Sequence, residues 1–279
     1  MDPATLIFLI FALLCVAMVS GFAAGLFGIG GGAVMVPALH YALKAIGVAN
    51  ETVMHTAVAT SAAVIIVNSW RSVRKHHARG SVDMDILLPK QIWRSYGLWI
   101  GAGSFLAALW IAPKMSGEAL TALFAIIAFF VSLQFIFGRP DFVIRQSVPG
   151  GLAPPVVGST VGGLSALMGI GGGSLSVPLL SLCNVPIHRA IGTASGFGLA
   201  IALPATAGFI ISGWGVGQRP VLSLGYVNIA GFAIIAGVSL FFVPLGVKAA
   251  HALNASMLKK IFGLCLMLVV LNMLRESLL

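Results

Sequence analysis

Long apolar runs, each close to the length that crosses a lipid bilayer, recur through this sequence and constrain its fold more than any other feature. They cover residues 4–26, 52–70, 98–112, 118–138, 187–213, 224–246 and 257–274. Roughly 20 apolar residues in a helix span the hydrocarbon layer. Only 8% of the residues are charged, whereas soluble domains carry about a quarter. The sequence therefore predicts an all-α integral membrane protein with about ten segments, located in the cell (inner) membrane.

The few charged residues are mostly basic, with 16 Lys and Arg against seven Asp and Glu and a net charge of +9. In a membrane protein this excess indicates topology rather than nucleic-acid binding, because Lys and Arg collect in cytoplasmic loops. We therefore expect the lipid bilayer, and no nucleic acid, as a partner. One basic cluster brackets a loop that we expect on the cytoplasmic side. It comprises Arg71, Arg74, Lys75, Arg79, Lys90 and Arg94.

The two halves of the chain share motifs in the same order. Gly-Ile-Gly-Gly-Gly at residues 28–32, followed by Val-Pro, recurs 141 residues later at 169–173, again followed by Val-Pro. A His-x-Ala-x-x-Thr pattern starts at His55 and a similar stretch starts at His188. We interpret this as a duplication. The predicted organisation is a first membrane repeat over 1–138, a cytoplasmic linker over 139–149 and a second repeat over 150–279.

The glycine clusters are expected to break helices, because each glycine costs about 1 kcal/mol in a helix interior relative to alanine. Each half is therefore predicted to contain a long helix, a break near the midplane, a short helix and three further spans. An odd number of crossings per half inverts the second repeat, and the distribution of basic residues favours that arrangement. The predicted fold is therefore two inverted repeats of about five helical segments each.

The breaks are the strongest candidates for a binding site. Broken helices of inverted repeats often meet at a midplane site, and a helix N-terminus attracts anions through unpaired N–H groups and its dipole. The alternative is that the small residues serve only close helix packing. The predicted substrate-binding residues at the breaks are Gly30, Gly31, Gly32, Gly171, Gly172, Gly173 and Ser174.

Hydroxyl and imidazole side chains follow the breaks in both halves. Thr60 and Ser61 lie about one turn beyond His55, and Thr193 and Ser195 lie beyond His188. The hydroxyls are predicted to donate to an oxyanion, although Ser and Thr in membrane helices also bond their own backbone. The two histidines are candidate substrate ligands, or alternatively residues that cap or orient a helix start.

The acidic residues all fall at chain ends or in loops, so no carboxylate is expected inside a span. Coupled pumps usually keep cation sites on such carboxylates. The substrate is therefore expected to be a small anion, and any coupled proton must be carried by a histidine or by the substrate. The three cysteines lie within apolar runs, and neither a metal site nor a cofactor is predicted.

The sequence resembles the TauE/SafE family of sulfite exporters. The doubled Gly-x-Gly-Gly-Gly-x-x-x-Val-Pro motif carries the resemblance, as do Gly-Ser-Val-Asp at 80–83 and Gly-Tyr-Val-Asn at 225–228. The resemblance implies transport, usually export, of a small sulfur-containing anion such as sulfite, sulfoacetate, thiosulfate or another organosulfonate. The family has Thr-Ser after the Ala-x-x stretch in both halves. Thr60-Ser61 keeps this pair, whereas Thr193-Ala194-Ser195 departs from it by one residue.

Two other classes of function remain as alternatives. The basic loop suits a membrane-embedded partner subunit or anchor for a soluble sulfur-metabolism enzyme, although an anchor does not require duplicated glycine breaks. An intramembrane hydrolase requires one nucleophile beside one base. Here Ser165 has no counterpart in the first half, so we expect no enzyme activity. Small-residue faces throughout the chain also permit a homodimer.

Overall fold

The computed structural model describes residues 3–138, 143–252 and 255–278, and these are mostly helical. The first half contains α1 (Pro3–Phe27), α2 (Gly32–Ala45), α3 (Asn50–His77), the short α4 (Met84–Leu87), α5 (Tyr96–Leu106) and α6 (Gly117–Phe137). The second half contains α7 (Ser159–Met168), α8 (Gly173–Leu182), α9 (Ile187–Ser212), α10 (Ile229–Ala252) and α11 (Ala255–Leu278). A two-residue hairpin, β1 (Ser223–Leu224) and β2 (Val227–Asn228), precedes α10.

Within the described ranges, six helices are long and apolar enough to cross a bilayer. They are Ile10–Phe27, Asn50–His77, Tyr96–Lys114, Gly117–Phe137, Ile187–Ser212 and Ile229–Ala252. The Tyr96–Lys114 segment continues α5 through a π turn over Ala107–Ile111 and a 3-10 turn over Ala112–Lys114. The prediction of a helical membrane protein is confirmed.

Two boundaries differ from the apolar runs. The helix over 52–70 continues to His77, because the basic residues beyond Trp70 extend the same helix rather than ending it. The run over 224–246 starts with the hairpin, since Asn228 pairs with Ser223 and its side chain caps the helix that follows. Residues 139–142 of the expected linker lie outside the described residues. Beyond them, the amides of Ile144 and Arg145 donate to the carbonyl of Leu182.

Both glycine clusters interrupt the helices as expected. α1 ends at Phe27 and α2 begins at Gly32, while α7 ends at Met168 and α8 begins at Gly173. Gly28, Gly30 and Gly31 have positive φ angles of 69°, 68° and 84°, which residues with a Cβ rarely adopt. α2 and α8 contain 14 and 10 residues. At 1.5 Å per residue, roughly 15–21 Å, each covers only part of a bilayer.

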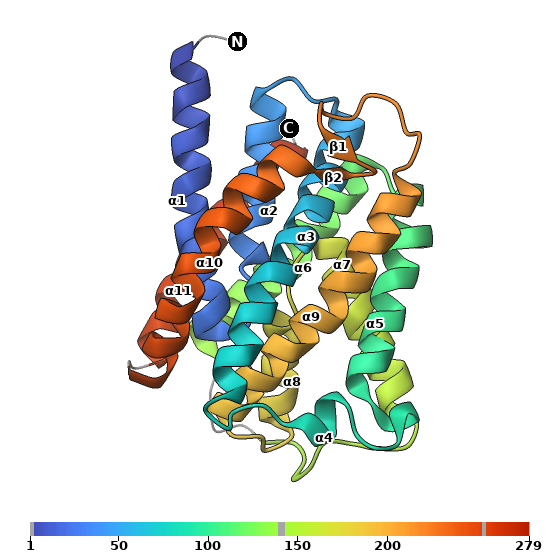
Figure 1. Ribbon diagram of the computed structural model, residues 1–279, viewed down its shortest axis with the longest axis vertical. Helices are drawn as coiled ribbons and strands as arrows, with labels where there is room; N and C mark the ends of the chain where they lie inside the picture. The colour runs from blue at the N-terminus through green and yellow to red at the C-terminus, as the bar shows by residue number, and fades with distance from the viewer. Residues whose placement is uncertain (1–2, 139–142, 253–254, 279) are drawn as a thin grey trace.

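The helices of the two halves pack against each other in equivalent pairs (Figure 1). α3 and α9 contact each other in the centre, α1 packs along α10, and α5 packs along α7. Because α1 corresponds to α7 and α5 to α10 in the repeat, the last two contacts are the same contact made twice. α3 and α9 run antiparallel, since Ser72 contacts Ser195 while Ser69 contacts Gly198. α4 and the β hairpin lie at opposite ends of the molecule.

Candidate functional site

The two glycine breaks lie directly against each other in the middle of the molecule. A Cβ atom on Gly32 would collide with the carbonyl oxygen of Gly169, and one on Gly173 would lie 2.5 Å from the carbonyl carbon of Gly28. These contacts are equivalent, because residues 28 and 32 correspond to 169 and 173 in the repeat. The breaks therefore cross antiparallel, with Gly30 against Gly171 at the centre. This backbone contact requires glycine, so close packing accounts for part of the motif.

The remaining predicted residues at the breaks are also enclosed. Gly31 lies against the carbonyl of Ser20, and a Cβ on Gly30 would come within 2.8 Å of Ile65. Gly172 lies beside Phe197 and the amide of Gly198, both within 3.0 Å of a built Cβ. Ser174 is buried, and its hydroxyl lies 3.4 Å from the Gly171 carbonyl. Neither α2 nor α8 has a side-chain cap among the described residues.

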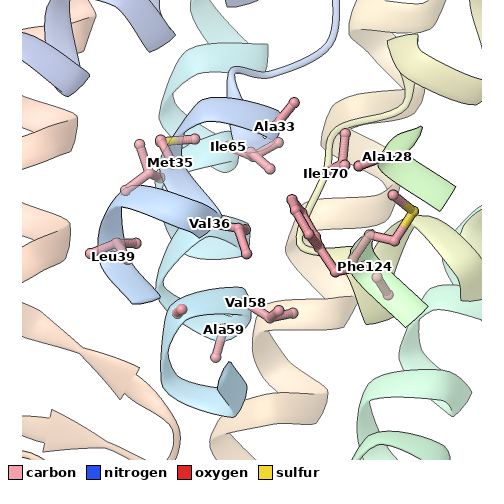
Figure 2. Packing of buried hydrophobic residues seen from close by; sticks show 14 of the residues in the cluster. Ala33, Met35, Val36, Leu39, Val58, Ala59, Ile65, Phe124, Ala128 and Ile170 are labelled. Atoms are coloured by element: carbon pink, nitrogen blue, oxygen red, sulfur yellow. The ribbon is translucent and has the colours of Figure 1, made fainter. Parts of the chain in front are cut away.

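Apolar side chains surround the crossing. Ile65 of α3 and Ile170 of the second break belong to one buried cluster with Phe124 and Ala128 of α6. Figure 2 shows Ile170 next to Ala128 and Phe124, with Val36 and Ile65 on the α2 and α3 side. The crossing is thus held in a largely apolar interior, where an unpaired polar group costs more than it does in water.

A row of polar side chains on α3 crosses this apolar interior. Asn68 donates to the carbonyl of Gly30 over 3.2 Å and accepts from the Ser239 hydroxyl over 2.7 Å. One helical turn further along, the hydroxyls of Ser72 and Ser195 lie 2.9 Å apart. These bonds tie α3 to the first break, to α10 and to α9.

Ser69 lies in the same row but is unpaired. Its hydroxyl is buried and has no hydrogen-bond partner among the described residues. It lies against Gly198, and a Cβ built on Gly198 would be 3.7 Å from the amide nitrogen of Gly172 at the start of α8. We did not predict Ser69 from the sequence. The available signal was the pair of polar residues at 68–69 within an otherwise apolar run.

Two of the predicted hydroxyls make equivalent contacts between the halves. Thr60 on α3 accepts a hydrogen bond of 2.9 Å from the amide of Asn228, and Thr193 on α9 accepts one of 2.8 Å from the amide of Asp83. The side chains of Asp83 and Asn228 in turn each cap the helix that follows. We call these contacts the Asp83 latch (Asp83 with Thr193) and the Asn228 latch (Asn228 with Thr60). They lie at the α4 end and the hairpin end (Figure 1).

The latches differ in charge. Arg189 forms an ion pair of 2.7 Å with the Asp83 carboxylate, with the Arg189 side chain 51% exposed. Asn228 is neutral, and the first-half counterpart of Arg189 is Thr56. The remaining predicted hydroxyls are paired within the protein, because Ser61 donates to the Gly169 carbonyl over 2.7 Å and Ser195 contacts Ser72. Anion contact by these hydroxyls stays a prediction.

The two predicted histidines lie in different environments. His55 is buried, with its ring nitrogens 3.0 Å and 2.9 Å from the carbonyl oxygens of Glu51 and Ala112. These contacts favour the orienting role over ligand contact. His188 is exposed at the α4 end, which we call the basic end because Arg74 and Lys75 in the last turn of α3 lie there, and its ring stacks on that of His251 at 5.2 Å. Substrate contact by either histidine stays a prediction.

Neither of two cavities in the described part of the chain has the lining that an anion requires. The larger, of about 430 Å³, lies between α1, α2 and α11 and is lined by apolar side chains and Tyr41. The smaller, of about 150 Å³, is bounded by Tyr96, Ser176, Cys183 and Phe197 among others. Burial raises the pKa of the Cys183 thiol, so this cysteine is no activated nucleophile.

Comparison with known proteins identifies the family. The family model described as "Sulfite exporter TauE/SafE" matches residues 13–273. A probable membrane transporter protein of Haemophilus influenzae is 34% identical over 269 residues, covering 94% of this chain and 98% of the relative. One from Methanocaldococcus jannaschii is 24% identical over 249 residues, covering 88% of each chain. No solved structure matches the chain. The protein therefore belongs to the TauE/SafE family of membrane transporters.

Proposed function

We propose that this protein exports a small sulfur-containing anion, such as sulfite, sulfoacetate, thiosulfate or another organosulfonate, by alternating access. The family description and the names of the relatives support transport. The charge distribution supports an anion. Glu51 and Glu118 lie in the first turns of α3 and α6 rather than in a loop as expected, no described acidic residue lies in the middle of a candidate span, and the chain carries a net charge of +9.

The unpaired hydroxyl of Ser69 beside the start of α8 is the observation that carries this proposal. A buried hydroxyl without a partner costs about 1–3 kcal/mol, and an anion that accepts a hydrogen bond removes this cost. The amides at the start of α8 add donors and the positive end of the helix dipole. Ser69 and Gly172 come from α3 and from the second break. The site therefore joins the two halves of the chain.

The equivalent position in the other half does not offer the same site. Both starts are closely packed, that of α2 by the Ser20 carbonyl against Gly31 and that of α8 by Phe197 and Gly198 against Gly172, so the difference lies in the side chain that faces each. The second-half counterpart of Ser69, 133 residues later, is Ala202, which is buried and carries no donor. We therefore propose one anion site per chain, at the start of α8.

Alternating access follows from an inverted-repeat arrangement, which we propose for this chain. The antiparallel crossing of the two breaks and the antiparallel packing of α3 on α9 support it. In this scheme the Asp83 latch closes the basic, cytoplasmic end, and the Asn228 latch closes the opposite end. Because both latches are formed, we assign the structure to a state closed at both ends. Opening one latch at a time exposes the central site to one side.

The decisive experiment is flux into proteoliposomes that contain the purified full-length protein. Sulfite, thiosulfate and sulfoacetate are offered separately, with acetate as a sulfur-free control and protein-free liposomes as a blank. We expect saturable flux of at least one sulfur anion and none of acetate. Equal flux of acetate would contradict the proposed selectivity. No flux of any anion would contradict transport of these substrates and favour the partner-subunit alternative.

A further inference from the structure

A buried histidine at the end of α3 has one ring nitrogen without a partner. His76 is 1% exposed, and its Nε2 lies 3.1 Å from the carbonyl oxygen of Gly25 on α1. Because a carbonyl oxygen only accepts, Nε2 carries the hydrogen and Nδ1 of the neutral ring carries a lone pair. Nδ1 is buried and has no hydrogen-bond partner among the described residues. The lone pair on Nδ1 is therefore free to accept a proton.

A line of imidazoles connects the ring of His76 with the surface at the basic end. The ring of His251 on α10 lies 5.6 Å from that of His76, and the ring of His188 on α9 stacks on His251 at 5.2 Å. His188 and His251 are both exposed. The titratable and charged groups that face His76 are these two histidines and Arg79 in the following loop. From α1, the facing polar group is the neutral carbonyl of Gly25.

His76 lies on the same side of α3 as the proposed anion site. Ser69, Ser72 and His76 are spaced at i, i+3 and i+7, which places them on one helix face. Seven residues correspond to roughly 10 Å along the helix axis. A positive charge on His76 is therefore close enough to attract an anion at Ser69 through a medium that screens less than water.

We propose that Nδ1 of His76 is a proton-binding site, filled from the basic end by way of His188 and His251, whose charge strengthens anion binding at Ser69. One proton passes from the aqueous phase to the Nδ1 lone pair, and the neutral ring becomes an imidazolium with one added positive charge. The Nε2 hydrogen bond to Gly25 is kept in both states. The effect on the anion rests on the proposed function, whereas the proton site itself does not.

The proton site is tested directly in the purified full-length protein with ¹⁵N-labelled histidine, by NMR from neutral pH to well below the ordinary imidazole range, because burial opposes the charged form of a histidine. His76→Gln identifies the signal and keeps a donor for the Gly25 carbonyl, and His77→Gln, at an exposed neighbouring position, is the matched control. We expect a signal that is lost only in His76→Gln, with hydrogen on Nε2 alone at high pH and a second proton on Nδ1 at lower pH. A ring that never gains this proton, or that carries it on Nδ1 at every pH, would overturn the inference.

The link to the anion is tested with thiosulfate, whose charge does not change over this range. We expect the KM at the basic face to fall on the order of fivefold or more as the site becomes protonated. His76→Gln should abolish this dependence, and His77→Gln should retain it. Flux with an unchanged pH profile in His76→Gln would overturn the inference and leave the transport proposal intact. If no anion moves, the transport proposal fails, and the NMR titration still decides the proton site.

Discussion

Replacing Ser69 with alanine should separate anion binding from stability. The hydroxyl has no protein partner among the described residues, so its removal breaks no internal bond and removes the cost of an unpaired buried donor. We therefore expect a free energy of unfolding equal to that of the wild type or higher, by up to about 1–3 kcal/mol. A hydrogen bond to a charged acceptor contributes about 1.5–3 kcal/mol. At 1.4 kcal/mol per factor of ten, the KM for thiosulfate should rise about 10- to 150-fold.

Ser72→Ala is the matched control, because it removes a hydroxyl from the same helix face one turn away. Ser72 bonds Ser195 over 2.9 Å, so its loss should lower stability by about 0.5–1.5 kcal/mol and leave KM within about twofold of the wild type. The measurements are thermal unfolding in detergent and initial rates in proteoliposomes. An unchanged KM in Ser69→Ala, with a loss of stability equal to that of Ser72→Ala, would refute the anion contact.

Three further changes test the frame around the site. Gly32→Ala forces a Cβ into the Gly169 carbonyl and should lower stability by about 1–3 kcal/mol. The control Gly237→Ala meets open space in α10 and should be neutral or stabilising. Equal shifts of the unfolding temperature in the two variants would contradict the contact between the two glycine breaks. Thr60→Val leaves the amide of Asn228 unpaired and Thr193→Val that of Asp83, so each variant should increase the labelling of a cysteine reporter placed at its own end of the molecule. Labelling at the same end in both variants would argue against two latches. Asp83→Asn keeps the helix cap but removes the ion pair with the exposed Arg189. It should therefore change stability by less than about 1 kcal/mol and make flux less dependent on salt. An unchanged salt dependence of flux would exclude a gating role for the ion pair.

The sequence was informative where local pattern decides structure. Three consecutive glycines disfavour a helix by about 1 kcal/mol each, so the breaks before α2 and α8 were predictable from propensity and repetition alone. The hydrogen-bond partners of the hydroxyls were not. Thr60 bonds an amide 168 residues away and Thr193 bonds one 110 residues away. Such contacts depend on how α3 and α9 pack, and no periodicity in the sequence records it.

The repeat identifies the residues that the two halves share, and Ser69 and His76 are not among them, because their second-half counterparts are Ala202 and Phe209. The shared residues hold the two halves together. The glycines of the breaks pack backbone against backbone, and the threonines receive the amides of the opposite loops. His55 and His188 are equivalent in sequence, yet one lies between two carbonyl oxygens in the interior and the other is exposed at the basic end.

The residues that the halves do not share are the better guide to chemistry. Asn68, Ser69, Ser72 and His76 on α3 correspond to Ile201, Ala202, Ala205 and Phe209 on α9, all buried. Buried polar groups cost free energy unless they are paired, so a polar row retained on only one of two equivalent helices needs a reason other than the frame. Asn68 and Ser72 find partners in the protein, whereas Ser69 and Nδ1 of His76 have none among the described residues. We propose that a ligand pairs with the first of these atoms, a donor, and a proton with the second, an acceptor on the same helix face.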